Sequence, residues 1–565
     1  MGMAEAKERI MRAAPVRKWG RGLVLAVLVL ACVAGISAPA KTVLPDGVAA
    51  ELRAQLSGNA ESQFAGMDRA ALLRFYRARD FRPAWLGNPA SGAAVAALEN
   101  AGADGLDPAD YHAGVLEAHQ LTDSAVNAAR YDLTLSDGVL AYAHDLRLGR
   151  VDPSRADKMV GLARPGFDAV AALSAALAEG NFQQWLASLP PTNPQYAALK
   201  MLLARYRSAE SQKWPQLPDA KKIELKTGTP SIDLLRNRLA GEGLLAANAL
   251  PDDMQVLEDA VKKFQTRNGL KADGVVGRQT IAALNVTPAA RAAQIKANLE
   301  RWRWLPHDLG PRYIEVNAAD TTLKVIDNGK VVLSSRVITG KPKTMTAIFN
   351  ADVIAITVNP IWHVPVSIAR KEILPKLRRN PAYLVREHII VVDGPAGDPY
   401  GQSVNWRAVS AANLHYEFRQ LPGEGNSLGL LKLEMPNPFS AYLHDTSARS
   451  LFARDERHLS HGCIRVQNIR PLAAYALYGA ALDGMEKIDT AIAVGETRRI
   501  PLDKPLPVYV LYWTAMADTD GTPEFRPDVY GRDKRLIAAL AGQPVNGAAL
   551  DGSSYAQSGC LSVAG

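Results

Sequence analysis

The chain has 565 residues, of which 48% are apolar and 22% are charged, and its formal net charge is +8. This composition is typical of globular protein and excludes an intrinsically disordered chain, while the length predicts about three or four domains. The positive excess is too small to indicate nucleic-acid binding.

The first forty residues have the pattern of an export signal. Basic residues end at Arg21, an uncharged run follows from Gly22 to Ser37, and Ala38-Pro39-Ala40 offers a cleavage site. The run is shorter than the roughly twenty residues that span a membrane. We therefore expect residues 1–40 to be a signal peptide and the protein to be periplasmic. An uncleaved anchor in the inner membrane and lipidation at Cys32 are the alternatives.

Cysteine is scarce, with only Cys32, Cys463 and Cys560 in the chain. A disulfide framework in an exported protein would show more cysteines, in even number. We do not expect Cys463 to pair with Cys560, and a lone cysteine retained in an exported protein indicates a reactive thiol.

Residues 43–230 are rich in Ala and Leu and predict a helical scaffold domain. Gly105 to Pro108 and Val151 to Pro153 are turn or helix-start signals within it. No residue pattern in this stretch indicates catalysis.

A small helical module is predicted from 231 to 286. Its apolar residues recur at helical spacing, and Gly269 can adopt the left-handed conformation that ends a helix. The run from Val261 to Asn285, VKKFQTRNGLKADGVVGRQTIAALN, resembles the three-helix peptidoglycan-binding module of wall enzymes. A plain spacer is the alternative. The residues predicted to share the buried face are Leu257, Ala260, Val261 and Phe264.

Residues 287–311 predict a linking helix, capped by Thr287 with Pro288 at its first position. Its apolar stripe consists of Ile295, Leu299 and Trp302.

From 312 to 540 the apolar pattern changes to a period of two, which predicts strands. Asp327 to Lys330 and Asp520-Gly521 are hairpin signals. A long polar and aromatic stretch from about 367 to 429 interrupts the strands and predicts a lid, with a plain structural insertion as the alternative. The predicted fold is therefore α+β and multi-domain: helical scaffold, small module and β-sandwich-like domain. A Gly- and Ser-rich disordered tail is expected over 541–565.

The chemistry concentrates between His444 and Cys463. His444 ends a predicted strand, and Ser460-His461-Gly462-Cys463 reads as a tight loop. A thiol has a free pKa of about 8.5 and needs a neighbouring imidazole to act as a nucleophile at neutral pH. Gly462 leaves room for a substrate carbonyl, and the loop amides are natural donors to an oxyanion. These are the components of an acyl transferase.

His444, a gap and Ser460-His461-Gly462-Cys463-Ile464-Arg465 resemble the signature of L,D-transpeptidases with a YkuD-type catalytic domain. Four segments are similar to the large multi-domain members: Gly105 to His112, Ile361 to Pro365, Asn426 to Asn468 and Val529 to Gly531.

The resemblance implies a reaction and roles. Cys463 attacks the carbonyl between diaminopimelate and terminal D-alanine of a peptidoglycan stem peptide, D-alanine leaves, and a second stem amine resolves the thioester as a 3→3 cross-link. His444 is the base, oriented by the carbonyl of Asp445, and His461 and Gly462 shape the oxyanion hole. Arg465 orients a substrate carboxylate. Some members have Asn at this position, two residues after the cysteine, so a role that depends on that Asn is in doubt for this chain. Further substrate-binding candidates are Ser460, Asn468, Trp406 and Tyr416.

Alternatives remain for these roles and for the function. His461 could support the loop only, Arg465 could anchor the loop through a salt bridge, and Trp406 and Tyr416 could simply pack. A hydrolase would use the same thioester, and a wall-binding scaffold would use none of this chemistry. A zinc site fits the close ligand spacing poorly. We expect no cofactor and no metal, and we expect carbapenems to acylate Cys463, as the family implies; oligomeric state stays open.

Overall fold

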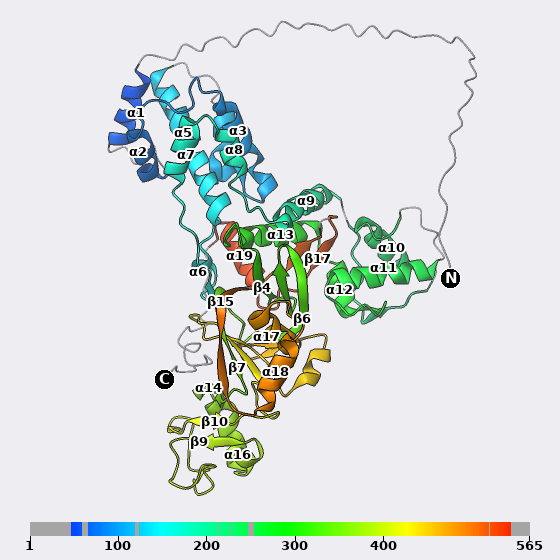
Figure 1. The fold of residues 1–565 in the computed structure, drawn as a ribbon. Helices are drawn as coiled ribbons and strands as arrows, with labels where there is room; N and C mark the ends of the chain where they lie inside the picture. Colours follow the sequence, from blue (N-terminus) through cyan, green and yellow to red (C-terminus); the bar gives the residue numbers. More distant parts are fainter. Residues whose placement is uncertain are drawn as a thin grey trace, which may run out of the picture. The chain divides into compact units, whose positions relative to one another are not determined.

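The computed structural model describes residues 47–58, 66–118, 124–212, 214–226, 228–246, 253–518 and 520–543 (Figure 1). The expected signal peptide lies outside these ranges, as does all but the first three residues of the expected tail. Within the described ranges, no helix combines the length and apolar character that crossing a membrane requires.

The scaffold is built around one long helix, α5 (Ala125–Leu148). The buried Asp132 on α5 accepts hydrogen bonds from the Tyr76 hydroxyl and from the amides of Ala84, Trp85 and Leu86, so it joins a helix to a loop. Asp107 and Asp152 cap short helices, so of the two predicted alternatives, turn or helix start, both segments are helix starts. The surrounding helices are α1 (Val48–Ser57), α2 (Arg69–Arg77), α3 (Ala90–Glu99), α4 (Ala113–Ala118), α7 (Ala169–Ala178) and α8 (Phe182–Ala187). The short helix α6 (Pro153–Ala156) lies outside this core, where Ala156 packs with Trp304 and Leu536.

The linking helix α13 (Pro288–Arg303) packs against α9 (Pro194–Ala209) in a shared core. The Thr287 side chain accepts a hydrogen bond from the Ala290 amide, which confirms the predicted cap. The predicted stripe of Ile295, Leu299 and Trp302 is buried, and Trp302 stacks on Trp513 with ring centroids 4.5 Å apart.

The small module contains α10 (Pro230–Gly241), α11 (Met254–Arg267) and α12 (Arg278–Leu284). The four predicted apolar residues of α11 are buried, and Gly269 has φ +63°, as expected. Strand β2 (Lys222–Ile223) pairs with β3 (Val276–Gly277), so Ile223, which precedes the expected range, also packs in the core of the module.

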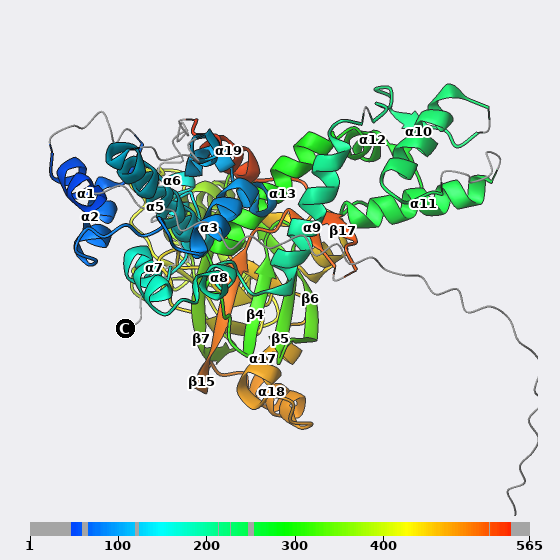
Figure 2. The ribbon, with the colours of Figure 1, turned by 90° about the horizontal axis from the view of Figure 1, so that it is seen from above.

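The β-rich domain predicted over 312–540 contains a ten-stranded sheet that closes on itself, because β15 (Arg498–Leu511) pairs with β4 (Arg312–Asn317) on one side and with β7 (Ile348–Val358) on the other. Figure 2 shows β7, β15, β4, β5 and β6 side by side. Asn328 and Gly329 both have positive φ at the β5–β6 turn, which confirms that hairpin. The strands are β4 (Arg312–Asn317), β5 (Thr322–Asp327), β6 (Lys330–Gly340), β7 (Ile348–Val358), β11 (Leu431–Glu434), β12 (Leu443–His444), β13 (His458–Ser460), β14 (Ile464–Val466) and β15 (Arg498–Leu511).

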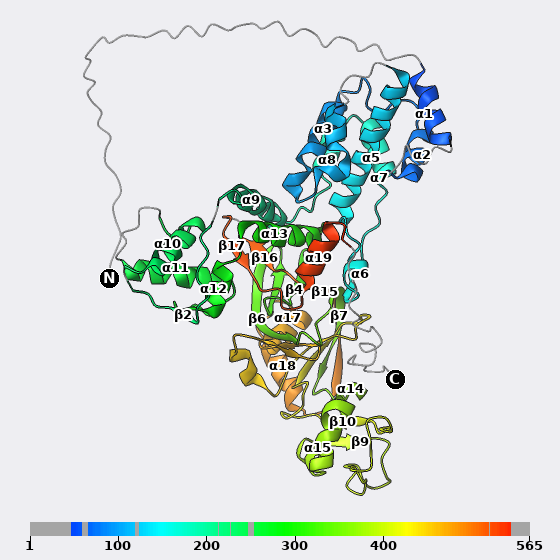
Figure 3. The same ribbon diagram turned by 180° about the vertical axis from the view of Figure 1, so that it is seen from behind.

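One strand of this sheet comes from the scaffold segment. Strand β1 (Val160–Gly161) runs parallel to β7, a contact that the helical reading of this stretch does not anticipate. The predicted late hairpin is present as β16 (Ala515–Ala517) and β17 (Pro523–Phe525). The remaining helices of the domain are α17 (Ile469–Tyr478), α18 (Gly484–Ala493) and α19 (Arg532–Leu540). Figure 3 shows α13 beside α19, and the Arg301–Asp533 ion pair joins them.

The inserted segment folds around its own core. Strands β8 (Trp362–His363), β10 (Phe418–Gln420) and β9 (Ile389–Val391) form an antiparallel three-stranded sheet. Its helical part contains α14 (Val366–Ile368), the single π-helical turn η4 (Ala369–Ile373), α15 (Leu374–Arg379) and α16 (Tyr383–Arg386). We call this segment, residues 362–420, the insertion.

Candidate functional site

Adjacent parallel strands bring the two predicted catalytic residues together. In the β12–β14 pairing, Leu443 faces Ile464 and His444 faces Arg465, and the Ile464 amide donates to the Tyr442 carbonyl. Leu443 and Ile464 point into the core of the sheet. Side chains alternate along a strand, so His444, Arg465 and the preceding Cys463 fall on the opposite face. Cys463 and His444 are therefore diagonal neighbours on one face of this pair of strands.

The prediction of a lone thiol at Cys463 is wrong for this structure, because Cys463 is disulfide-bonded. The chain has two other cysteines, Cys32 and Cys560, and both lie outside the described residues. The small number of cysteines excludes a framework of several disulfides, but it does not exclude a single disulfide, which needs only one other cysteine at bonding distance. Nucleophilic chemistry at Cys463 therefore requires prior reduction.

His444 is a neutral, buried imidazole. It is 4% exposed, and burial, together with the nearby charges of Arg465 and Lys432, lowers the pKa of His444 to about 3. The Asp445 main chain acts in the other direction and raises this pKa, yet Nδ1 makes no hydrogen bond of standard geometry with any described residue. At neutral pH the ring is therefore unprotonated.

Two cations flank His444 in the sheet. Arg465 faces it from β14 and Lys432 faces it from β11, so all three side chains share one face. Burial lowers the pKa of Arg465, and its Nε has no hydrogen-bond partner within the described ranges. Lys432 lies over the Tyr442 ring, with Nζ 4.5 Å from the centroid. The arrangement favours an anionic group beside the imidazole.

The loop before Cys463 is braced internally. Ser460 is 2% exposed, and its hydroxyl donates to the Cys463 carbonyl at 2.6 Å and accepts from the Gly462 amide at 3.1 Å. Gly462 has φ +121°, a conformation that favours glycine. The structure thus uses the predicted substrate-binding hydroxyl of Ser460, and the Gly462 amide, to hold the loop.

His461 connects this loop to the insertion. Its Nε2 lies 2.6 Å from Oε1 of Glu372, which sits in the π-helical turn η4. The hydrogen bond from His461 is the largest of the effects that lower the pKa of Glu372. Turns of this kind are frequent at functional sites. Sequence reasoning did not single out Glu372, because no local motif marks it.

Three other candidates lie elsewhere. Trp406 is 2% exposed in the core of the insertion, where its Nε1 donates to the Gly401 carbonyl, and Tyr416 packs against it. The Asn468 side chain donates to the Ser334 carbonyl on β6. The structure therefore gives these three residues packing and bracing contacts and does not group them with Cys463.

An apolar rim surrounds Cys463 instead. Leu428, Tyr442 and Cys463 form a buried cluster, and Trp362 of β8 packs against it. Burial raises the pKa of Tyr442, so its hydroxyl stays neutral. The sequence indicated two residues of this rim, because Trp362 lies in the segment Ile361 to Pro365 and Tyr442 lies two residues before His444. No group of three or more potential metal ligands occurs within the described ranges.

Family models match three parts of the chain. Residues 311–497 match the model described as "L,D-transpeptidase catalytic domain" (YkuD). This match covers His444 and the whole Ser460–Cys463 loop. This part of the chain is therefore similar to the catalytic domain of L,D-transpeptidases. Residues 70–203 match a "Scaffold domain" and residues 229–284 a "Putative peptidoglycan binding domain".

Among known relatives, a protein of Haemophilus influenzae described as "Putative L,D-transpeptidase" is 31% identical over 267 residues, which cover 46% of this chain and 53% of the relative. The chain thus spans about half the length of this curated relative. A crystal structure of the L,D-transpeptidase of Xylanimonas cellulosilytica aligns with 52% of this chain and 98% of its own, at 16% identity and a TM-score of 0.18.

Proposed function

We propose that the protein is a periplasmic L,D-transpeptidase that forms 3→3 cross-links in peptidoglycan through a thioester on reduced Cys463. The observation that carries the proposal is the register of β12 and β14, which places His444 and Cys463 on one face inside the matched catalytic domain.

In the first step, neutral His444 accepts the thiol proton as sulfur attacks the carbonyl that precedes the terminal D-alanine of a donor stem. The carbon–nitrogen bond breaks, the leaving amine takes a proton, and D-alanine departs. Amides of the Ser460–Cys463 loop stabilise the oxyanion. Arg465 binds a substrate carboxylate, because its guanidinium has an unpartnered Nε beside the imidazole.

In the second step, the side-chain amine of an acceptor diaminopimelate attacks the thioester, which restores the thiol. Water in place of the amine would give hydrolysis, so the two outcomes share one intermediate. The small module, whose match covers 229–284, supports delivery of this chemistry to the wall by binding peptidoglycan.

The test uses the reduced protein and purified disaccharide tetrapeptides. Mass spectrometry is expected to show dimers that have lost one D-alanine, and the Cys463→Ala variant is expected to form none while still binding wall sacculi. Shortened stems without dimers would establish a hydrolase instead, and dimers formed by Cys463→Ala would overturn the assignment of the nucleophile.

A further inference from the structure

The connection between β6 and β7, residues 341–347, passes beneath the loop that carries Cys463. Thr346, in this connection, is fully buried and makes contact with that loop. We infer that Thr346 is a positioning residue, which fixes the Gly462–Cys463 peptide for acyl transfer and is itself held by Tyr530 and Arg532. This inference rests on the proposed function and gives a role to Thr346 and Arg532, which lie outside the motifs quoted above.

The Thr346 hydroxyl serves two backbone groups at once. It donates to the Gly462 carbonyl at 2.8 Å and accepts from the Gly340 amide at 2.9 Å. A hydroxyl is both donor and acceptor, so serine could replace this group but valine could not. Valine has nearly the shape of threonine and would leave two buried backbone groups without their partner.

The consequence for catalysis follows from the planarity of the peptide bond. In a trans peptide, the carbonyl of Gly462 and the amide of Cys463 point in opposite directions. The hydrogen bond from Thr346 to this carbonyl therefore sets the direction of the Cys463 amide, which points to the side of the loop away from Thr346. Donors for an oxyanion act only when they are aimed before the charge develops.

The rest of the connection holds the loop as well. The Ser460 carbonyl accepts from the Lys341 amide and from the Thr344 hydroxyl, each at 3.0 Å. The turn is so tight that a Cβ added at Gly340 would lie 1.9 Å from the Thr344 carbonyl oxygen. Gly340 thus allows the connection to fold back under the loop, and Thr346 is delivered to a defined position.

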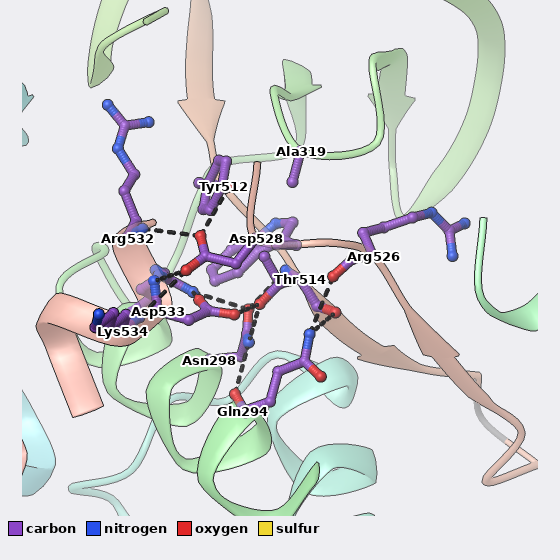
Figure 4. Close-up of polar contacts among 12 residues, drawn as sticks. Gln294, Asn298, Ala319, Tyr512, Thr514, Arg526, Asp528, Arg532, Asp533 and Lys534 are labelled. Carbon is purple, nitrogen blue, oxygen red and sulfur yellow. Dashed lines mark hydrogen bonds and ion pairs between the residues drawn. The ribbon is translucent and has the colours of Figure 1, made fainter. Parts of the chain in front are cut away.

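Residues near α19 fix the connection from behind. The Tyr530 hydroxyl donates to the Gly340 carbonyl at 2.6 Å, and Arg532 donates to the Thr346 carbonyl at 3.0 Å. The Tyr530 ring stacks on Tyr512, and Figure 4 shows Asp528 accepting from the Tyr512 hydroxyl and from the Arg532 amide. The buried Arg532 also pairs with Asp157 at 2.8 Å.

The experiment compares two reactions at Cys463 in the reduced, full-length protein. Acylation by a carbapenem develops an oxyanion, whereas alkylation by iodoacetamide is a displacement at carbon that needs none. Thr346→Val is expected to slow acylation about 10-fold or more and to change alkylation less than about 2-fold. Thr346→Ser is expected to restore acylation to within about 3-fold of wild type.

Thr134→Val, which removes a buried hydroxyl from the scaffold helix α5, is the matched control and is expected to leave both rates unchanged. Tyr530→Phe is expected to show the same selective loss as Thr346→Val, in smaller degree. Equal slowing of both reactions, or no slowing of acylation in Thr346→Val, would overturn the inference. Absence of a Cys463 adduct in the wild-type protein would instead contradict the proposed function.

Discussion

Removing the charge of Arg465 should raise the pKa of His444. The two residues face each other across β12 and β14. With charges about 6 Å apart and an effective dielectric of about 20, Coulomb's law gives about 3 kcal/mol, or about two pKa units. Arg465 is partly exposed, so screening reduces the expected shift to about one unit.

The assay is an NMR titration of the imidazole in a Cys463→Ala background, which removes both the thiol and the disulfide. The pKa of His444 is expected near 3 and is expected to rise by about one unit when Arg465→Met is added. Arg499→Met is the matched control, because Thr357 and Lys432 separate Arg499 from His444 in the sheet, and it should shift the pKa much less. Titration of His444 near 6.5, or equal shifts in the two variants, would refute this reasoning.

Three further predictions follow from the same contacts. His444 has a lower pKa in the folded than in the unfolded protein, so its contribution to stability is complete above pH 6.5 and is lost as pH falls towards 3. The urea concentration at the midpoint of unfolding should therefore decrease over that pH range. The decrease should be smaller in the His444→Gln variant. Because Cys463 is disulfide-bonded, adding a reductant should switch on carbapenem acylation, and equal acylation without reductant would contradict this. The Glu372→Gln variant weakens the half-exposed ion pair between Glu372 and His461, and a pair of this kind contributes about 0.2–1 kcal/mol. The rate of proteolysis within the insertion should therefore rise a few-fold at most. The control variant Glu424→Gln should leave this rate unchanged.

Local patterns predicted the elements of this fold well. The α11 face, the Thr287 cap and the hairpin at Asn328-Gly329 all depend on residues within one turn or one helix of each other. Strand β1 is different: two residues of the scaffold segment acquire a strand conformation only because β7 lies beside them. Local strand propensity does not depend on the pairing strand, which lies almost two hundred residues away in the sequence.

The roles of individual site residues divide in the same way. Trp406 and Tyr416 have the composition of a binding surface, but the insertion has enough apolar residues to form its own core and uses them there. Ser460 lies in the predicted catalytic motif, but a buried hydroxyl needs hydrogen-bond partners, and its partners are the Cys463 carbonyl and the Gly462 amide of its own loop.

The sequence by itself contained the His444 and Ser460–Cys463 motif, the prediction of acyl-transfer chemistry and the order of the parts, because each of these depends on neighbouring residues. Tertiary structure alone decided the state of Cys463, the pKa of His444 and the contacts of Thr346 and Glu372. Those contacts join residues 116 and 89 positions apart. Burial and electrostatic fields depend on which residues the fold places next to one another, and the linear order of residues does not state this directly.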